Sequence, residues 1–284
     1  EVPEAKGWIA WTQINVDFLS VDAFEAAPAY DNDQLGILVG ADFVKDPSLK
    51  LGLFAGRDSN ESDFSPGSSM NSDSIHLGAY ASLSNDSGMY LNAILSGSTS
   101  DLDSRRSVTF QGVDRSAAAE FDSHQINASV HFGRDFKHGH FTFGPMAGFE
   151  FSHLYVDSFT ETGADSLNLK LRSQSVDQLH GDLGGHVAFH MQVNKDLVLI
   201  PEVRASLNYS IQDNGRTIES VLDGGQGDAF DYDPEGRDRV GVSTAIGLNA
   251  LRGDAWSASI FWNTNTIERD YDSQSFSLNL DYRF

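Results

Sequence analysis

Residues 274–284 read QSFSLNLDYRF, and this stretch decides the fold class of the chain. From Phe276 onward, apolar residues take every second position and polar residues fill the positions between, up to the terminal Phe284. A period of two is typical of a β-strand with one apolar and one polar face. One such strand also ends many soluble domains, so the fold class depends on whether the pattern recurs.

Twelve segments carry this alternation along the chain. Tight-turn sequences rich in Asn, Asp, Gly, Pro and Lys lie at 45–48, 85–88, 137–139, 194–196 and 252–254. The connections between them are mostly longer and polar. Short turns at one rim and long loops at the other are typical of an outer-membrane barrel. The segments are 14–18, within a strand that begins near residue 7, then 35–43, 49–55, 75–83, 89–95, 126–132, 141–151, 179–191, 197–209, 240–248, 256–262 and 276–284.

The two faces of these segments indicate which one points inward. The apolar faces are nearly uncharged over about ten residues, the length of a membrane-spanning strand. Aromatic residues, including Trp8, Phe43, Phe141, Trp256 and Phe284, lie near the short turns, where a membrane barrel has its aromatic girdle. We therefore predict an all-β fold, a twelve-stranded antiparallel transmembrane β-barrel, over a soluble all-β sandwich. The polar residues predicted to line its lumen are Asp42, Glu150, His180, Asp182, His186, His190, Glu202 and Arg204.

Composition excludes several other classes of protein. The 284 residues carry a formal net charge of −22, which argues against nucleic-acid binding. Cysteine is absent, so the chain has no disulfide, no thiolate zinc site and no thiol nucleophile. No apolar run approaches the length of a membrane-spanning helix. Residues 1–6 are not a signal peptide, so we interpret the sequence as a mature, cleaved or trimmed chain.

At this point the chain resembles the translocator domain of classical autotransporters, the barrel of type V secretion. Nearly its whole length takes part, through the order and spacing of its segments. The opening stretch 7–18, GWIAWTQINVDF, resembles the family's first strand, and a terminal strand ending on an aromatic resembles its assembly signal, here Tyr282 and Phe284. Further matching stretches are DNDQLGILVGADFVKDPSLKLGLFAGRDSNESDF (31–64), IHLGAYASLSNDSGMYLNAILSGSTSDLDSRR (75–106), SQSVDQLHGDLGGHV (173–187) and LIPEVRASLNY (199–209).

The resemblance implies a monomeric barrel in the outer membrane of a Gram-negative bacterium, with long loops extracellular and both termini periplasmic. It implies that residues 7–284 anchor and help secrete an N-terminal passenger domain, and that residues 1–6 are the remnant of a linker helix. The implied partners are the passenger and linker, the barrel assembly machinery, periplasmic chaperones, lipopolysaccharide and lipid. The alternative is a stand-alone porin or channel with the same number of strands.

We assign no catalytic residue, cofactor or metal from the sequence. The lumen histidines and carboxylates favour a hydrated polar wall over a metal site, because neighbours on one strand lie too far apart to share an ion. Lumen acids cleave the linker in some autotransporters, and Asp42, Glu150, Asp182 and Glu202, with Arg204, are the candidates for such self-cleavage here. No linker asparagine is present to assign it. An enzymatic barrel needs Ser and His on its outer surface, and the outward segments carry almost no His.

Two charged regions lie in the predicted loops. The stretch 223–238 carries weak calcium candidates, Asp228, Asp231, Asp233 and Glu235, but it lacks EF-hand spacing, so a solvated acidic loop is favoured. Arg105, Arg106 and Arg115 fall on a predicted long loop, where we expect contact with lipopolysaccharide phosphates.

Overall fold

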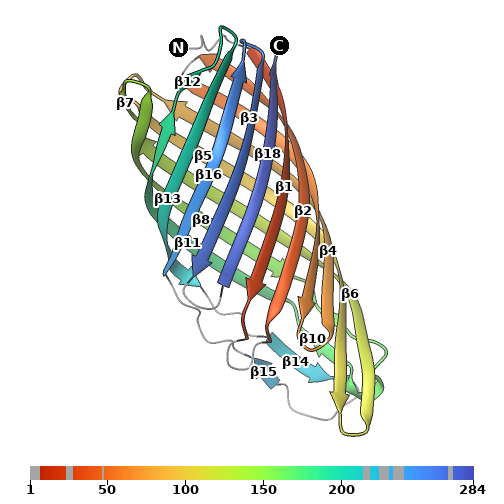
Figure 1. The fold of residues 1–284 in the computed structure, drawn as a ribbon. Helices are drawn as coiled ribbons and strands as arrows, with labels where there is room; N and C mark the ends of the chain where they lie inside the picture. Colours follow the sequence, from red (N-terminus) through yellow and green to blue (C-terminus); the bar gives the residue numbers. More distant parts are fainter. Residues whose placement is uncertain are drawn as a thin grey trace.

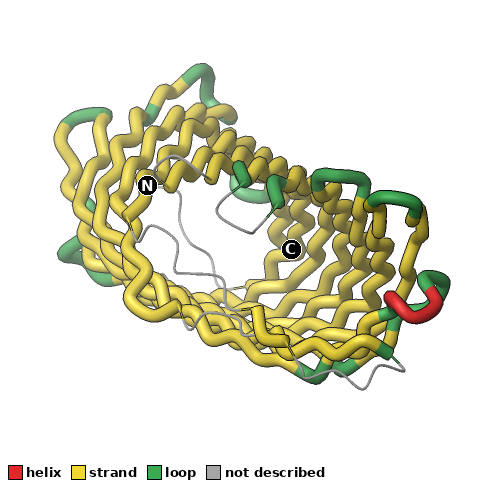
Figure 2. Tube along the Cα trace, turned by 90° about the horizontal axis from the view of Figure 1, so that it is seen from below, coloured by secondary structure: helices red, strands yellow, loops and turns green. Residues whose placement is uncertain are grey.

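Strands make up nearly all of the fold, which comes from a computed structural model that describes residues 7–23, 28–46, 48–213, 218–223, 230–232, 240–267 and 271–284. Within these ranges, twelve long antiparallel strands form a closed barrel, which confirms the predicted fold class (Figures 1 and 2). The long strands are β1 (Gly7–Val21), β2 (Tyr30–Asp46), β3 (Leu49–Phe64), β4 (Ser68–Ser84), β5 (Met89–Phe110), β6 (Val113–Arg134), β8 (Phe141–Val156), β11 (Gln174–Phe189), β13 (Leu197–Asp213), β16 (Val240–Arg252), β17 (Trp256–Ile267) and β18 (Tyr271–Arg283).

The barrel closes because the first and last strands pair with each other. β1 pairs with β2 on one side and with β18 on the other, from Ile9 opposite Arg283 to Val21 opposite Tyr271. Each long strand thus has a partner on both sides, which removes the unpaired edges of an open sheet. Both ends of the described chain lie at the same rim, which Figure 1 shows at the top.

The predicted tight turns all lie at the rim that holds the chain ends. Gly88, Gly139 and Gly253 have φ of 79°, 61° and 59° there, a left-handed conformation that glycine adopts without steric cost. Two short strands, β7 (Phe136–His138) and β12 (Met191–Gln192), extend hairpins at this rim. The turn residues therefore confirm which connections are short.

The opposite rim differs from the prediction of mostly long loops. β5 and β6 each continue for 22 residues, so that only Gln111 and Gly112 connect them, and residues 65–67 alone connect β3 to β4. Arg105, Arg106 and Arg115 consequently lie on strands and not on a loop. The alternation of β5 is lost after residue 97 because the outward face of the strand meets water, and not lipid, beyond the membrane-facing band.

The two longest connections at this rim contain a second, small sheet. It has the order β15–β14–β10–β9, with β10 (Leu169–Leu171) pairing with β14 (Ile218–Leu222). The two outer strands of this sheet are β9 (Phe159–Thr160) and β15 (Phe230–Tyr232). A 3₁₀ turn, η1 (Asp165–Leu167), lies between β9 and β10 in the chain. Among the described residues no helix has the length and apolar character needed to cross a membrane.

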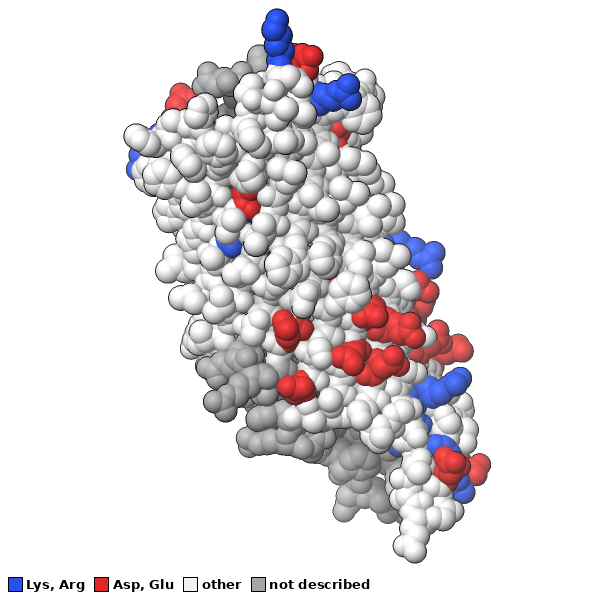
Figure 3. Space-filling model, viewed as in Figure 1, with Lys and Arg blue, Asp and Glu red and all other residues white. Residues whose placement is uncertain are grey.

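The outer surface carries the apolar rows. Leu53, Leu77 and Leu183 are 68%, 64% and 66% exposed, and the exposed large hydrophobic residues follow the outward positions of all twelve long strands. Charged residues are sparse over this band in Figure 3. At the edge of the band next to the tight-turn rim, Trp8 packs on Phe43, Phe141 on Phe189, and Trp256 on Tyr282, with ring centroids 4.6–5.3 Å apart. These contacts place the predicted aromatic residues in one girdle.

Candidate functional site: the polar lumen

The most enclosed polar group of the inner wall is the carboxylate of Asp42, near the end of β2. Its side chain is 3% exposed and accepts hydrogen bonds from Trp11 Nε1 at 3.0 Å and from the hydroxyl of Tyr80. Lys50 Nζ lies 3.3 Å from its second oxygen. Donors from β1, β3 and β4 thus converge on one carboxylate, which compensates for its burial and ties four adjacent strands together.

Glycines on neighbouring strands let the large aromatic rings of this wall lie flat. A Cβ on Gly40 would stand 2.3 Å from the Trp11 ring, and one on Gly52 would stand 2.1 Å from Tyr80 Cζ. Phe54 covers Gly78 in the same way, at 2.3 Å. Each glycine is directly opposite its ring in the strand register, so the absence of a side chain is what admits the ring.

A second polar group lies on the wall formed by β6, β8 and β11. His131 Nε2 stands 3.4 Å from Asp182 Oδ1 and 3.5 Å from Glu150 Oε1. Gly148 makes room for this contact, because a Cβ there would stand 2.3 Å from both Asp182 and His131. The three ionisable side chains come from three adjacent strands, a grouping that distances along a single strand did not suggest.

His186, Glu202 and Arg204 form a neighbouring group. His186 Nε2 lies 3.0 Å from Asp135 Oδ1, and its Nδ1 lies 3.5 Å from Glu202. Glu202 also accepts from Arg204 Nε at 2.6 Å, while the guanidinium lies over the Phe261 ring at 4.9 Å. Arg204 is thus the charge partner of Glu202 in particular. His190 stands apart from this group, with its Nε2 3.0 Å from Thr142 Oγ1.

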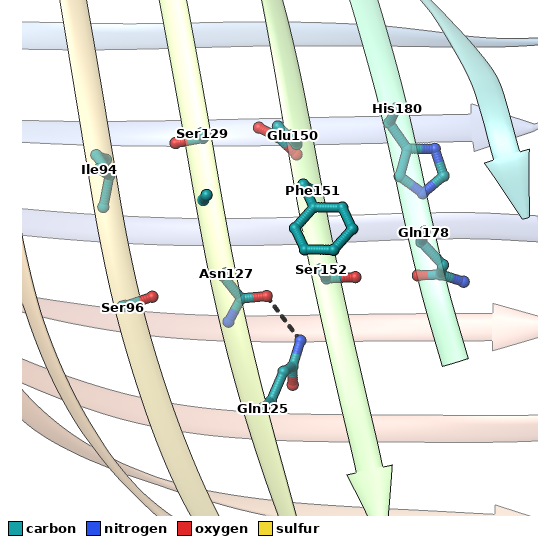
Figure 4. Close-up of a pocket in the computed structure, with 11 residues that line it drawn as sticks. Ile94, Ser96, Gln125, Asn127, Ser129, Glu150, Phe151, Ser152, Gln178 and His180 are labelled. Carbon is teal, nitrogen blue, oxygen red and sulfur yellow. Dashed lines mark hydrogen bonds between the residues drawn. The ribbon is translucent and has the colours of Figure 1, made fainter. Parts of the chain in front are cut away.

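A cavity of about 470 Å³ opens in the wall beside His131, and its lining is shown in Figure 4. His180 and Glu150 are directly opposite each other on β11 and β8 and both line it. The other polar lining residues are neutral, namely Ser96, Gln125, Asn127, Ser129, Ser152 and Gln178. The structure thus divides the eight predicted lumen residues. Glu150, His180 and Asp182 lie around this cavity, and His186, Glu202 and Arg204 form the neighbouring group. His190 stands apart from both, and Asp42 lies on β2, several strands away.

The remaining wall is hydrogen-bonded, mostly through neutral side chains, although Asp58 contacts His76 and Asp281 accepts from Ser257 Oγ at 2.7 Å. Asn208 Nδ2 donates to Asn265 Oδ1 at 3.1 Å and also contacts Ser243, while Asn263 Nδ2 donates to Ser275 at 3.0 Å. These residues come from β13, β16, β17 and β18. Among the described residues, no group of three or more His, Asp or Glu side chains is arranged to hold a metal ion. The chemistry that this lumen offers is therefore hydrogen bonding and charge pairing.

Arg106 and Arg115 make contacts within the protein at the rim opposite the tight turns. Arg106 binds Glu161 through two hydrogen bonds of 2.8 and 2.5 Å, and its hydrogen bond to this carboxylate raises the pKa of Arg106 above its ordinary value. Arg115 donates to Ala164 O at 2.9 Å. Both arginines thus hold the 157–173 connection against the long β5–β6 hairpin. The expectation that Arg105, Arg106 and Arg115 meet lipopolysaccharide phosphates stays a prediction.

The weak calcium candidates stay untested. Asp228, Asp233 and Glu235 lie outside the described residues, and of Asp231 only the backbone is described, in β15 opposite Glu219.

One feature of the outer face was missed by the sequence reasoning. His153 Nδ1 contacts Asp177 Oδ1 at 2.6 Å, and the two residues are directly opposite each other on β8 and β11. His153 continues the outward row of Phe149 and Phe151, so the alternation itself, extended by one further step, identifies it. The outward rows therefore do carry a histidine, held by a carboxylate.

Acidic residues form a belt on the outer face, next to the apolar band on the side away from the tight-turn rim, which is the lower part of Figure 3. We call it the acidic rim. Asp73 lies directly opposite Asp101, and Asp101 directly opposite Asp122 on the next strand. Like charges at directly opposite positions destabilise a sheet. The acidic rim comprises Asp33, Glu61, Asp73, Asp101, Asp103, Glu120 and Asp122.

Substituting Asp101→Asn is expected to stabilise the barrel by about 1 kcal/mol at low salt, because it removes two like-charge pairs of up to about 1 kcal/mol each. The gain should vanish between about 0.01 M and about 1 M NaCl, as the screening length falls from about 30 Å to about 3 Å. Urea unfolding in lipid vesicles measures it. Asp73→Asn is the matched control with a smaller gain, because Asp73 also pairs with Arg57 at 2.9 Å. A gain that is equal at both salt concentrations would contradict the electrostatic cause.

The terminal strand meets the first strand up to its last residue. Phe284 N donates to Trp8 O at 3.0 Å, and the Phe284 ring lies 4.9 Å from that of Tyr282. Phe284 is 76% exposed, on the outward row. The two predicted signal residues thus form an aromatic pair at the seam where the barrel closes.

Comparisons with known proteins agree with this geometry. Residues 10–263 match the sequence profile of the family described as "Autotransporter beta-domain". The outer membrane protein A of Rickettsia conorii (strain ATCC VR-613 / Malish 7) is 31% identical over 80 residues, which are 28% of this chain. That of Rickettsia rickettsii is 30% identical over 80 residues, also 28% of this chain. The matched region spans 4% of the length of each of these curated relatives.

Solved structures share the fold at low identity. The translocator domain of autotransporter NalP from Neisseria meningitidis has a TM-score of 0.77 and 14% identity, covering 99% of this chain and 90% of that chain. The β domain of the Bordetella autotransporter BrkA has a TM-score of 0.76 and 17% identity, covering 98% and 100%. The family match covers most of the chain. The chain therefore belongs to the autotransporter β-domain family and is an outer-membrane translocator barrel.

Proposed function

We propose that the lumen holds the segment that joins the barrel to its passenger, and that the inner-wall charges which reach the lumen, such as Glu150 and Arg204, grip it. The observation that carries this proposal is the concentration of ionisable side chains on the inner wall, at Asp42, Glu150, Asp182 and Glu202 among others, while the outer band is apolar. Residues 1–6 would be the remnant of that segment, and the translocator barrel would comprise residues 7–284.

The difference in length between the connections at the two rims supports one orientation in the membrane. We propose that the tight-turn rim, with both chain ends, faces the periplasm, and that the β5–β6 hairpin and the small sheet face the cell exterior. Outer-membrane barrels combine short periplasmic turns with long extracellular connections. Because each long strand has two partners, a single chain leaves no barrel edge for oligomerisation, which supports a monomer.

The partners that meet the folding barrel are a further part of this proposal. Tyr282 and Phe284, exposed at the closing seam, would be the signal that the barrel assembly machinery reads after periplasmic chaperones deliver the unfolded chain. The apolar band would contact lipid, and the rim above it lipopolysaccharide. We do not assign self-cleavage to the lumen acids, because the sequence offers no linker asparagine for them to activate.

Surface display tests the proposed function. A reporter domain placed before Glu1, behind a secretion signal, should reach the cell surface and be removed by protease added to intact cells. The same reporter inserted in the tight turn at 85–88 should stay protected, since that rim is proposed to be periplasmic and the terminal signal stays intact. A barrel that inserts and conducts ions while its N-terminal reporter stays protected would instead be the stand-alone channel.

A further inference from the structure

A hairpin at the tight-turn rim presents aromatic rings and one arginine on the outside of the barrel. β7 and the first residues of β8 form it, and it lies beside the upper rim in Figure 1. Phe136 lies directly opposite Phe143, and both residues are 42% exposed on the outward face. Phe141, 48% exposed, continues this face and packs on Phe189 with ring centroids 4.9 Å apart. We call these rings the aromatic patch, and aromatic belts of membrane proteins lie at the level of the lipid headgroups.

Arg134 is held at the edge of the aromatic patch. It is the last residue of β6 and is exposed, on the same outward row as Phe132 and Phe136. Its guanidinium carbon lies 5.0 Å from the centre of the Phe136 ring, and its Nε donates to Ser87 O at 3.3 Å. Nη1 and Nη2 have no hydrogen-bond partner among the described residues, so both can donate to an acceptor from outside the protein. The arrangement fits an acceptor with paired oxygens, because a guanidinium can donate parallel hydrogen bonds.

Arg134 also lacks a counter-charge within the protein. In the part of the chain that the structure describes, no carboxylate forms an ion pair with it. Asp135, its neighbour in the chain, points to the lumen side, where its Oδ1 lies 3.0 Å from His186 Nε2. Arg57, by contrast, is an outward arginine with a carboxylate partner, Asp73, at 2.9 Å. An unpaired guanidinium beside apolar rings favours an anionic ligand that the membrane supplies.

We propose that Arg134 binds the phosphate of an anionic phospholipid in the leaflet that meets the tight-turn rim, while the aromatic patch contacts the upper acyl chains of that lipid. A phosphate offers the paired oxygens that the free Nη atoms of the guanidinium require. Phosphatidylglycerol fits best, because its headgroup contains no cation that would compete with Arg134 for the phosphate. The choice of leaflet rests on the proposed function, which places this rim in the periplasm, whereas binding of the headgroup does not.

Native mass spectrometry of the barrel in detergent micelles, titrated with phosphatidylglycerol or with phosphatidylcholine of the same acyl chains, tests the inference. Phosphatidylglycerol should bind with a dissociation constant about fivefold below that of phosphatidylcholine, the effect expected of one arginine near an anionic lipid. Arg134→Gln should remove this difference. Phe136→Leu keeps the charge but loses the ring that positions it, so the difference should fall about twofold.

Lys137→Gln is the matched control. Lys137 belongs to the same hairpin and is exposed, but alternation places it on the opposite side from Phe136, so the preference should remain about fivefold. A preference that survives Arg134→Gln, or one that Lys137→Gln removes equally, would overturn the site.

Further outcomes are decided by the same titration. If Arg134→Gln does not fold, Phe136→Leu decides alone, because a preference that it leaves unchanged would also overturn the proposal. Lipid A is titrated in the same way, and tighter binding of it that depends on Arg134 would overturn the assignment to a phospholipid. Micelles have no leaflets, so failure of this site leaves the surface-display test of the proposed function unaffected.

Discussion

Leu53→Arg is expected to lower the free energy of unfolding by about 2–4 kcal/mol, the cost of arginine at the midplane of a barrel's lipid-facing surface. Leu53 is 68% exposed, and its direct neighbours on β2 and β4 are Ala41 and Ala79. Neither neighbour offers a counter-charge, so the guanidinium must stretch toward an interface or thin the bilayer. Urea unfolding of the barrel folded in lipid vesicles measures the effect.

Ser59→Arg on the same outward row of β3 is the matched control. Ser59 lies opposite Asp73 at the level of the acidic rim, so its arginine has both water and a carboxylate nearby. We expect a change within about 1 kcal/mol, because the cost of a charge falls toward the interface. Equal losses for both variants would show that the band around Leu53 is not the surface that meets lipid.

Gly52→Ala is expected to lower the free energy of unfolding by about 2–3 kcal/mol, because it leaves a buried charge with fewer donors. The new Cβ would stand 2.1 Å from Tyr80 Cζ and 2.5 Å from Tyr80 Oη, so the ring must leave its place. Tyr80 would then give up its hydrogen bonds with Asp42 and Trp11. The measurement is again unfolding in vesicles.

Gly97→Ala makes the same chemical change where a Cβ meets only Gln125 O, at 3.7 Å, and should cost within about 0.5 kcal/mol. Tyr80→Phe removes the hydroxyl while keeping the ring. Because both changes act through the Asp42 hydrogen bond, Gly52→Ala and Tyr80→Phe together should lower the free energy of unfolding by less than the sum of the two single changes. Full additivity would assign the Gly52 effect to backbone strain alone.

The predicted strands and tight turns were confirmed because both signals are local. A strand with lipid on one side and a polar lumen on the other must alternate, and each of the twelve segments overlaps one of the twelve long strands. Where the two faces of a strand do not differ between lipid and a polar lumen, the prediction of strand and loop was wrong. Residues 98–125 lie beyond the membrane-facing band, so their outward face has no apolar row, and nothing in their alternation distinguishes the long β5–β6 hairpin from a loop.

The inner wall was predictable as a set of residues but not as a set of contacts. Alternation places Glu150, Asp182 and Glu202 on the inward face, since it needs only the position of each residue along its strand. It cannot say that His131 meets Asp182 across β8, or that Asp42 meets Tyr80 across β3. Such contacts depend on the stagger and tilt of the strands around the closed barrel.

The sequence by itself therefore determined the all-β class, the twelve strands, the apolar outer band and the rim that carries the tight turns. These follow from the period of two and from turn chemistry, which act within a few residues. Only the tertiary structure decided that Arg106 pairs with Glu161, that glycines admit Trp11 and Tyr80, and that Glu150 and His180 line one cavity. The physical reason is that closure of β1 on β18 fixes one register for the whole ring, and that register brings distant strands into contact.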